Sequence, residues 1–227
     1  MRKRKTVLII AAHPDDELLG CAGTVRKYVE EGWEAVSLIL GEGLRSRGKA
    51  GVSKIKELKR HALAANAQIG ISEVCFEGLP DNSFDSIPLL TIIKKVEKYV
   101  ARFSPDVIFT HFAKDLNIDH RLTFQAVMTA CRPQPGVKHP EIYCFEVPSS
   151  TDYGQFSPDN AFSPNTFINI EKEIDLKLKA LSNYTTEMRS APHSRSLAGI
   201  KVLAQYRGAM AGLRYAEAFL LIRKIVD

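Results

Sequence analysis

The sequence predicts an α/β fold, a Rossmann-like and mostly parallel sheet with helices on both faces. Two observations carry this prediction. Strand-like and helix-like segments alternate along the first two thirds of the chain, which favours a parallel sheet. The first of them, TVLIIAA at 6–12, is a continuous apolar run, typical of a strand covered on both faces. We therefore expect the loops that follow the strands to meet along one edge of the sheet.

The next elements follow from local pattern. Apolar residues recur at helical spacing in 17–32 and end at a glycine, which predicts a first helix. The apolar segment EAVSLILG at 34–41 predicts a second strand. A second helix is expected at 53–70, with Ser53 as its N-cap and Gly70 just past its end.

Three strands and two helices continue the alternation. The same criteria predict strands at 73–78, 105–111 and 141–148, and helices at 86–103 and 119–132. The C-terminal part has a different character. A polar loop containing Pro and Gly is expected at 149–165, and helices at 170–184 and 196–212. The final segment at 216–225 fits a strand or a helix, and we favour a strand.

Composition indicates one soluble globular domain spanning 1–227, with an α/β core at 1–148 that carries the site and a remainder at 149–227 that completes it. No linker, repeat or low-complexity block divides the chain. The net charge of +5 is modest and about half of it could come from the first five residues, so no basic stripe predicts nucleic-acid binding. An acidic or phosphorylated small substrate remains compatible with this charge.

Two further features bear on the compartment. The basic start and the apolar run after it outline a signal peptide, but acids follow where a small-residue cleavage site should be, so a strand is expected instead. No stretch approaches the roughly 18 apolar residues of a membrane span. The cysteines are scattered and form no CxxC, which indicates reduced thiols of a cytoplasmic protein; they are Cys21, Cys75, Cys131 and Cys144.

Acids and histidines crowd the ends of two predicted strands. His13, Asp15 and Asp16 follow the first strand, and His111 and His120 lie at and after the fourth. Both groups should face the same edge of the sheet. A catalytic zinc site takes three His or carboxylate ligands and keeps a position for water. His13, Asp16 and His120 can supply that set, which leaves Asp15 free to take a proton from the metal-bound water.

Simpler interpretations exist for each part of this pattern. Acids after a strand often only cap a helix and complement its dipole, and a lone histidine is more often structural; His61 and His139 stay in that class. The glycines after the second strand lack the spacing and the lysine of a phosphate loop. The first strand-to-helix turn holds HPDDELLG where a dinucleotide fingerprint belongs, which disfavours a Rossmann oxidoreductase.

The sequence resembles the PIG-L/LmbE-like family of zinc-dependent N-acetyl sugar deacetylases over nearly the whole chain. AAHPDDE matches the first motif of the family, THFAKDLNIDHRLTFQAV the second, and PHSRS…RG…YAEAF its C-terminal pattern. The resemblance implies an LmbE-like fold with one zinc per chain, held by His13, Asp16 and His120, and Asp15 as the general base. Other divalent transition metals also suit such a set. The resemblance also suggests a homo-oligomer.

The same resemblance implies residues that contact the substrate. Arg47, in GEGLRSRG, and Asp81, in LPDNSFD, match segments that touch the sugar, and His111 is a third candidate. On chemistry alone, Arg47 could equally be an exposed loop arginine and Asp81 a turn former.

One position departs from the family pattern. Many members carry His-Pro-Asp-His in the second motif, where the first histidine stabilises the oxyanion, whereas this chain has Asn117 there. An asparagine amide can donate to an oxyanion but cannot act as an acid near neutral pH. The leaving amine then needs its proton from Asp15 or from another histidine, His193 or His111. A loop setting makes His193 plausible as a merely exposed residue.

These inferences predict a hydrolase that removes acetyl from an N-acetylated amino sugar. A conjugate of N-acetylglucosamine, such as a glycan precursor or a sugar-thiol precursor, is the expected small-molecule substrate. The alternatives are an amidase acting on another acylated small molecule and a carbohydrate-binding protein with a vestigial metal site. A phosphoesterase is disfavoured because such enzymes usually need two metals.

Overall fold

The computed structural model describes residues 4–44, 51–154 and 157–226 of the chain, with only the backbone of Val52. Within these residues the strands form one seven-stranded sheet in the order β3-β2-β1-β4-β5-β7-β6. The strands are β1 (Thr6–Ala11), β2 (Glu34–Gly41), β3 (Glu73–Leu79), β4 (Val107–His111), β5 (Glu141–Phe145), β6 (Thr166–Asn169) and β7 (Ala216–Arg223). The first five pair in parallel, and β7 runs antiparallel to both β5 and β6.

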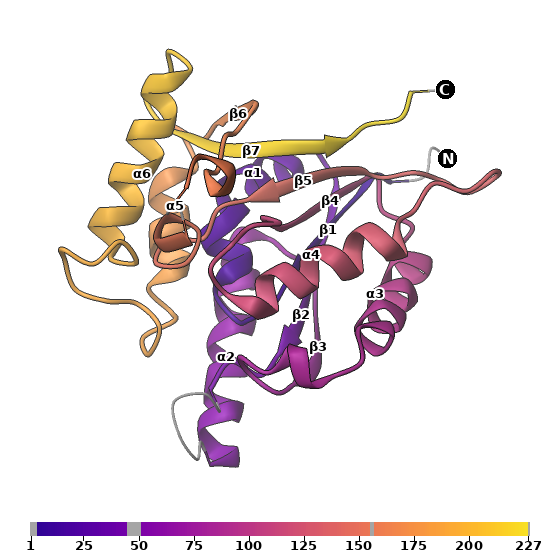
Figure 1. The fold of residues 1–227 in the computed structure, drawn as a ribbon. Helices are drawn as coiled ribbons and strands as arrows, with labels where there is room; N and C mark the ends of the chain where they lie inside the picture. Colours follow the sequence, from indigo (N-terminus) through magenta and orange to yellow (C-terminus); the bar gives the residue numbers. More distant parts are fainter. Residues whose placement is uncertain (1–3, 45–50, 155–156, 227) are drawn as a thin grey trace.

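Helices cover both faces of this sheet (Figure 1). They are α1 (Asp16–Glu30), α2 (Val52–Ile69), α3 (Leu89–Phe103), α4 (Ile118–Ala130), α5 (Ile174–Leu181) and α6 (Leu197–Met210). Short 3-10 turns lie at η2 (Phe84–Ser86), η3 (Asp152–Gly154) and η4 (Pro158–Asn160). The predicted α/β class, a mostly parallel sheet between two helical layers, is confirmed.

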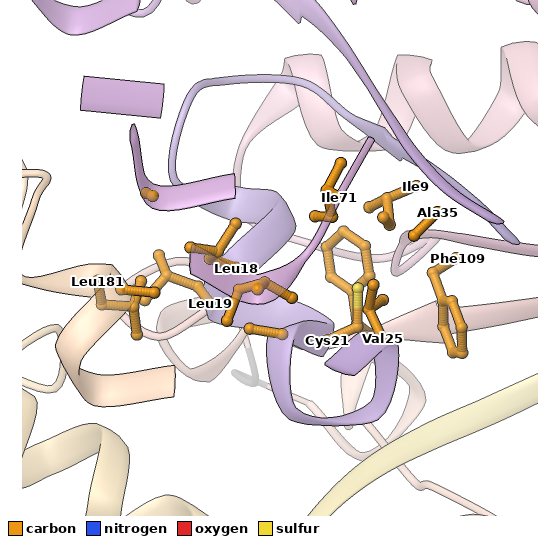
Figure 2. Close-up of a cluster of buried hydrophobic side chains, with 14 of the residues drawn as sticks. Ile9, Leu18, Leu19, Cys21, Val25, Ala35, Ile71, Phe109 and Leu181 are labelled. Atoms are coloured by element: carbon orange, nitrogen blue, oxygen red, sulfur yellow. The ribbon is translucent and has the colours of Figure 1, made fainter. Parts of the chain in front are cut away.

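Alternating side chains of β1 feed two separate cores. Val7 and Ile9 pack with side chains of α1 and α2, and Figure 2 shows part of this cluster around Ile9. Leu8 and Ile10 pack on the opposite face with side chains of α3 and α4. Both faces of the strand are therefore buried, which explains its uninterrupted run of aliphatic residues.

Some predicted boundaries were wrong. Gly51, not Ser53, caps α2, and Ser53 lies in the first turn of the helix. The helix expected from residue 170 begins at Ile174, because the backbone N–H of Ile170 donates to Tyr215 of the chain leading into β7. The strand β6 was missed; its four residues are all only partly buried, so no burial pattern marks it.

Helix α1 is broken at Cys21, whose backbone (φ −148°, ψ 17°) is not helical. The carboxylate of Glu217 in β7 enters the break and accepts hydrogen bonds from the N–H groups of Gly23 (2.9 Å) and Thr24 (2.7 Å). Lys177 of α5 bridges Glu217 (2.6 Å) and the carbonyl of Leu19 (2.8 Å). A buried ion pair thus replaces the missing helical hydrogen bonds and ties α1 to α5 and β7.

The site lies where the chain order reverses in the sheet. β1 and β4 are neighbours, and the strands that follow them in the sequence lie on opposite sides. The loops leaving the carboxyl ends of β1 and β4 diverge there, which is where open α/β sheets place their sites.

In the described part of the chain no helix combines the length and apolarity needed to cross a membrane. The four cysteines are free and buried, as predicted.

Candidate metal centre

The carboxylate of Asp16 is the centre of the first motif. Its Oδ2 accepts the backbone N–H of His13 at 2.9 Å, and lies 3.4 Å from Nδ1 of the same histidine. Nε2 of His120, in the first turn of α4, lies 3.2 Å from that oxygen. The ligand atoms of His13, Asp16 and His120 all lie within 4.8 Å of one another. Side chains 104 positions apart in the sequence therefore converge on one point, as the strand order predicts.

A second carboxylate lies behind the imidazole of His120. Nδ1 of His120 is 3.1 Å from Oδ1 of Asp115, and the hydroxyl groups of Ser150 and Thr151 each donate to Asp115 at 2.5 Å. The ring of His120 therefore has one nitrogen near Asp16 and the other against a carboxylate. Histidines that bind metals are oriented in this way.

The other imidazole repeats the arrangement with two carboxylates. Nε2 of His13 lies 2.9 Å from Asp119 and 3.2 Å from Asp81. These three residues form a second group that could hold a cation, but it shares His13 with the first. The simplest account is that Asp81 and Asp119 fix the ring so that Nδ1 faces Asp16. Two imidazole nitrogens and one carboxylate then form a donor set that suits zinc and iron(II).

The pKa values show how strongly this cluster favours positive charge. Burial lowers the pKa of the imidazoles, but the surrounding carboxylates outweigh it and raise the pKa of His13 to about 10 and that of His120 to about 9. Burial raises the pKa of Asp16, yet His120 and His13 bring it well below its usual range. Anionic oxygen held this far from water requires a cation, and a divalent metal ion is one that these donors can bind.

Asp15 stands beside the set with a strained backbone. Its φ of 105° lies in the left-handed region, which costs a residue other than glycine about 1–3 kcal/mol and persists only where neighbours impose it. Asp15 is the N-cap residue of α1, yet its side chain makes no capping hydrogen bond. Its Oδ2 instead pairs with Nη1 of Arg195 at 3.0 Å. Burial raises the pKa of Asp15 well above its usual value, and Arg195 opposes that rise.

Arg195 was not among the predicted site residues. It comes from the loop before α6 and also donates to Ser149 Oγ at 3.1 Å, so it joins the C-terminal part of the chain to the first motif. The tail pattern PHSRS contains it, but nothing in the spacing of that segment indicates a partner 180 residues away.

The carboxamide of Asn117 is engaged on both sides. Its oxygen accepts the backbone N–H of Asp119 at 2.8 Å and caps α4, and its nitrogen donates to Asn82 Oδ1 at 2.8 Å. Asp81 is buried against His13. These two predicted residues therefore lie next to the three candidate ligands: Asp81 contacts His13, and Asn117 caps the helix that carries His120.

The other predicted residues lie in different surroundings. His111 is completely buried, its ring stacks on His120 at 3.9 Å, and its Nε2 accepts the N–H of Ala12 at 2.8 Å. The buried ring of His111 therefore supports that of His120, and its contact with the sugar stays a prediction. His193 is partly buried and its Nδ1 accepts the N–H of Arg195 at 3.0 Å. Arg47 lies outside the residues that the structure describes.

Comparison with known proteins agrees with this site. Residues 8–131, which include both motifs, match the family model PIG-L: GlcNAc-PI de-N-acetylase. The uncharacterized deacetylase YaiS of Escherichia coli (strain K12) is 28% identical over 80% of this chain and 91% of its own. Diacetylchitobiose deacetylase of Thermococcus kodakarensis is 26% identical over 94% and 81%. A probable N-acetyl-alpha-D-glucosaminyl L-malate deacetylase 2 of Bacillus cereus is 24% identical over 80% and 83%.

Solved structures share the fold at lower sequence identity. N,N'-diacetylchitobiose deacetylase from Pyrococcus horikoshii superimposes with a TM-score of 0.78 at 19% identity, over 97% of this chain and 85% of its own. GalB, the 4-carboxy-2-hydroxymuconate hydratase of Pseudomonas putida KT2440, gives a TM-score of 0.79 at 21% identity over 98% of both chains. The fold thus supports more than one reaction, and the sequence match decides the family. The family model matches more than half of the 227 residues of this chain, and the chain therefore belongs to the PIG-L family.

Proposed function

We propose that this protein is a zinc-dependent hydrolase that removes the acetyl group from an N-acetylated amino sugar. The observation that carries the proposal is the convergence of His13, Asp16 and His120 beside the carboxylate of Asp15, which lies outside this set of three and makes no capping hydrogen bond. The relatives named above as deacetylases act on sugar conjugates by their names, which supports the same class of substrate here.

The residues divide the work of amide hydrolysis. Zinc held by His13, Asp16 and His120 would polarise the acetyl carbonyl and lower the pKa of a water molecule. Asp15 takes the proton from the attacking water, since its carboxylate adjoins the set without being part of it. Arg195 keeps that carboxylate in place through the contact at 3.0 Å.

The remaining steps need a donor for the oxyanion and a proton for the leaving nitrogen. Asn117 is our candidate for the first, because one of its two amide hydrogens stays available after the bond to Asn82. Asp15 can return its proton to the amine. His193 is the alternative donor, since its Nδ1 is occupied by Arg195 and its Nε2 is the nitrogen left to exchange a proton.

An exposed aromatic side chain adjoins this machinery and suits a sugar ring. Tyr153 of η3 is 53% exposed, and its ring centroid lies 6.5 Å from that of His193. It follows Ser150 and Thr151, which hold Asp115 behind His120. Carbohydrates present apolar C–H faces to such rings, and we propose that Tyr153 and Arg47 contact the substrate.

Buried free thiols agree with a cytoplasmic location.

Acetate release tests the proposal. The protein, stripped of metal and then reloaded with one equivalent of zinc, is offered diacetylchitobiose and malate-, lipid- and nucleotide-linked N-acetylglucosamine. We expect acetate from at least one conjugate with reloaded protein only. The matched control is Asp15→Asn, expected to keep zinc and lose turnover. A 4-carboxy-2-hydroxymuconate-type acid is included because GalB shares the fold; its hydration, with no amide cleaved, would overturn the proposal.

A further inference from the structure

Glu17 is the one acid of the HPDDE motif without a role in the reaction proposed above, and it is almost completely buried at 1% exposure. Its Oε2 accepts the backbone N–H of Asp15 at 3.0 Å. Its Oε1 accepts hydrogen bonds from Asn66 Nδ2 at 2.7 Å and from the hydroxyl of Tyr184. Both oxygens of a carboxylate two residues from the proposed base are therefore committed to fixed donors.

The donors come from distant parts of the chain. Asn66 lies on α2, and its Oδ1 accepts the hydroxyl of Ser37 in β2 at 2.7 Å. Tyr184 follows α5 and is the largest fully buried side chain in the described part of the chain. Ser37 and Asn66 are likewise without exposure. The position of Glu17 is thus set by β2, α2 and the segment after α5, none of which contributes a proposed metal ligand.

The bond to Asp15 falls at the strained point of the motif. Asp15 has the left-handed φ of 105° while His13 and Asp16, on either side, face the metal set. A strained residue keeps its conformation only where surrounding contacts outweigh the alternatives. The Oε2 contact fixes the peptide N–H of Asp15 itself, and Arg195 fixes its carboxylate.

We infer that Glu17 is a positioning residue that holds the backbone of Asp15 in its left-handed conformation and so directs the base toward the attacking water. The inference rests on the proposed function for the role of Asp15, although the backbone contact does not depend on it. An interpretation of Glu17 as a simple first-turn acid of α1 leaves its three buried donors unexplained.

Glu17→Gln is the sharpest test, because a carboxamide has one oxygen and one NH2 group. If the carboxamide oxygen accepts from Asn66 and Tyr184, the NH2 group faces the N–H of Asp15, and two donors then meet. If the carboxamide is rotated by half a turn, its NH2 group faces the donors of Asn66 and Tyr184 instead. The matched control is Asn66→Ala, which removes a donor to Oε1 of the same carboxylate but leaves the contact of Oε2 with Asp15. Glu17→Asp keeps the charge and withdraws it by one methylene, and serves if Glu17→Gln does not fold.

Two readouts are measured on each variant. With zinc loaded, Glu17→Gln should lose about 30- to 100-fold in kcat with KM and zinc affinity within about threefold, since misplacing a catalytic group by about 1 Å costs this much. Without zinc, the Asp15 amide proton should exchange about tenfold faster with solvent in Glu17→Gln, and remain unchanged in Asn66→Ala.

The outcomes separate the claims. Unchanged exchange at Asp15 in Glu17→Gln and Glu17→Asp overturns the positioning role, as does an equal loss of kcat in Asn66→Ala. A loss of zinc affinity that parallels the loss of kcat also overturns it, because Glu17 would then support Asp16. If wild-type protein releases no acetate, the proposed function fails, while the exchange measurement still decides what Glu17 does.

Discussion

Arg195 and Asp15 form a nearly buried ion pair, Nη1 to Oδ2 at 3.0 Å, although 180 residues separate them in the sequence. The pair joins the loop before α6 to the turn that opens α1. It also places a permanent cation beside the carboxylate that we assign as the base, in a site otherwise rich in acids. The C-terminal part of the chain therefore contributes to the proposed reaction centre as well as to the fold.

Replacing Arg195 should impair turnover more than substrate binding. In Arg195→Gln the carboxylate of Asp15 loses its charged partner and its orientation, so we expect kcat to fall about 10- to 100-fold with a small change in KM. Arg195→Lys keeps the charge without the second contact to Ser149, and should recover part of the loss. Steady-state kinetics on the three proteins decide this; a Lys variant no better than Gln would contradict it.

Metal affinity should depend on Asp115, which touches no proposed substrate. Asp115 contacts the ring nitrogen of His120 that faces away from Asp16. Burial raises the pKa of Asp115, but His120 and the hydroxyl groups of Ser150 and Thr151 outweigh it and hold this pKa below its usual range. Removing such an orienting carboxylate costs about 10- to 100-fold in metal affinity. Asp115→Asn should show that loss in zinc competition with a chelating dye.

Thr151→Val is the matched control for Asp115. It removes one of the two hydroxyl donors to the carboxylate and leaves the charge and the contact to His120. Its zinc affinity should fall by less than that of Asp115→Asn. Equal affinities in wild type and Asp115→Asn would show that the charge of Asp115 does not support metal binding by His120.

Sequence alone predicted that His13, Asp16 and His120 lie together, because they follow β1 and β4 and parallel neighbours end at one edge of a sheet. The partners of those residues were harder to predict. Arg195 meets Asp15 only through the way the C-terminal segment folds over the sheet, and no periodicity encodes such a contact. The same holds for Asp81, which a turn explains well in sequence but which lies against His13. Local pattern predicts where an acid stands, while its partner depends on tertiary packing.

Substrate affinity should depend on Tyr153, whose side chain is exposed beside His193. Tyr153→Ala removes an aromatic surface next to His193 without touching His13, Asp16 or His120. We therefore expect KM for a sugar substrate to rise about tenfold with kcat within about threefold, as stacking contributes about 1 kcal/mol or more. Tyr153→Phe keeps the ring and should behave as wild type. A Phe variant as weak as Ala would show that the hydroxyl group, and not the ring, binds the sugar.

The stability of the protein should depend on the ion pair inside the break of α1. Lys177 and Glu217 are each about 4% exposed in their side chains and 2.6 Å apart. Lys177→Met leaves the charge of Glu217 buried among the N–H groups of Gly23 and Thr24, and removing one member of such a pair costs about 3–5 kcal/mol. Urea denaturation should show this loss in the free energy of unfolding.

The double variant Lys177→Met/Glu217→Gln separates charge from packing at that break. Gln removes the buried charge but keeps one oxygen for the N–H groups of Gly23 and Thr24, so the double variant should be more stable than Lys177→Met alone. If it is less stable, the carboxylate is compensated by the two backbone donors without Lys177, and the lysine then contributes through its bond to the Leu19 carbonyl. The break lies at Cys21, one turn beyond Glu17 of the first motif. Zinc should raise the free energy of unfolding by the same amount in wild type, Lys177→Met and the double variant, because the ion pair and the candidate metal ligands share no contact.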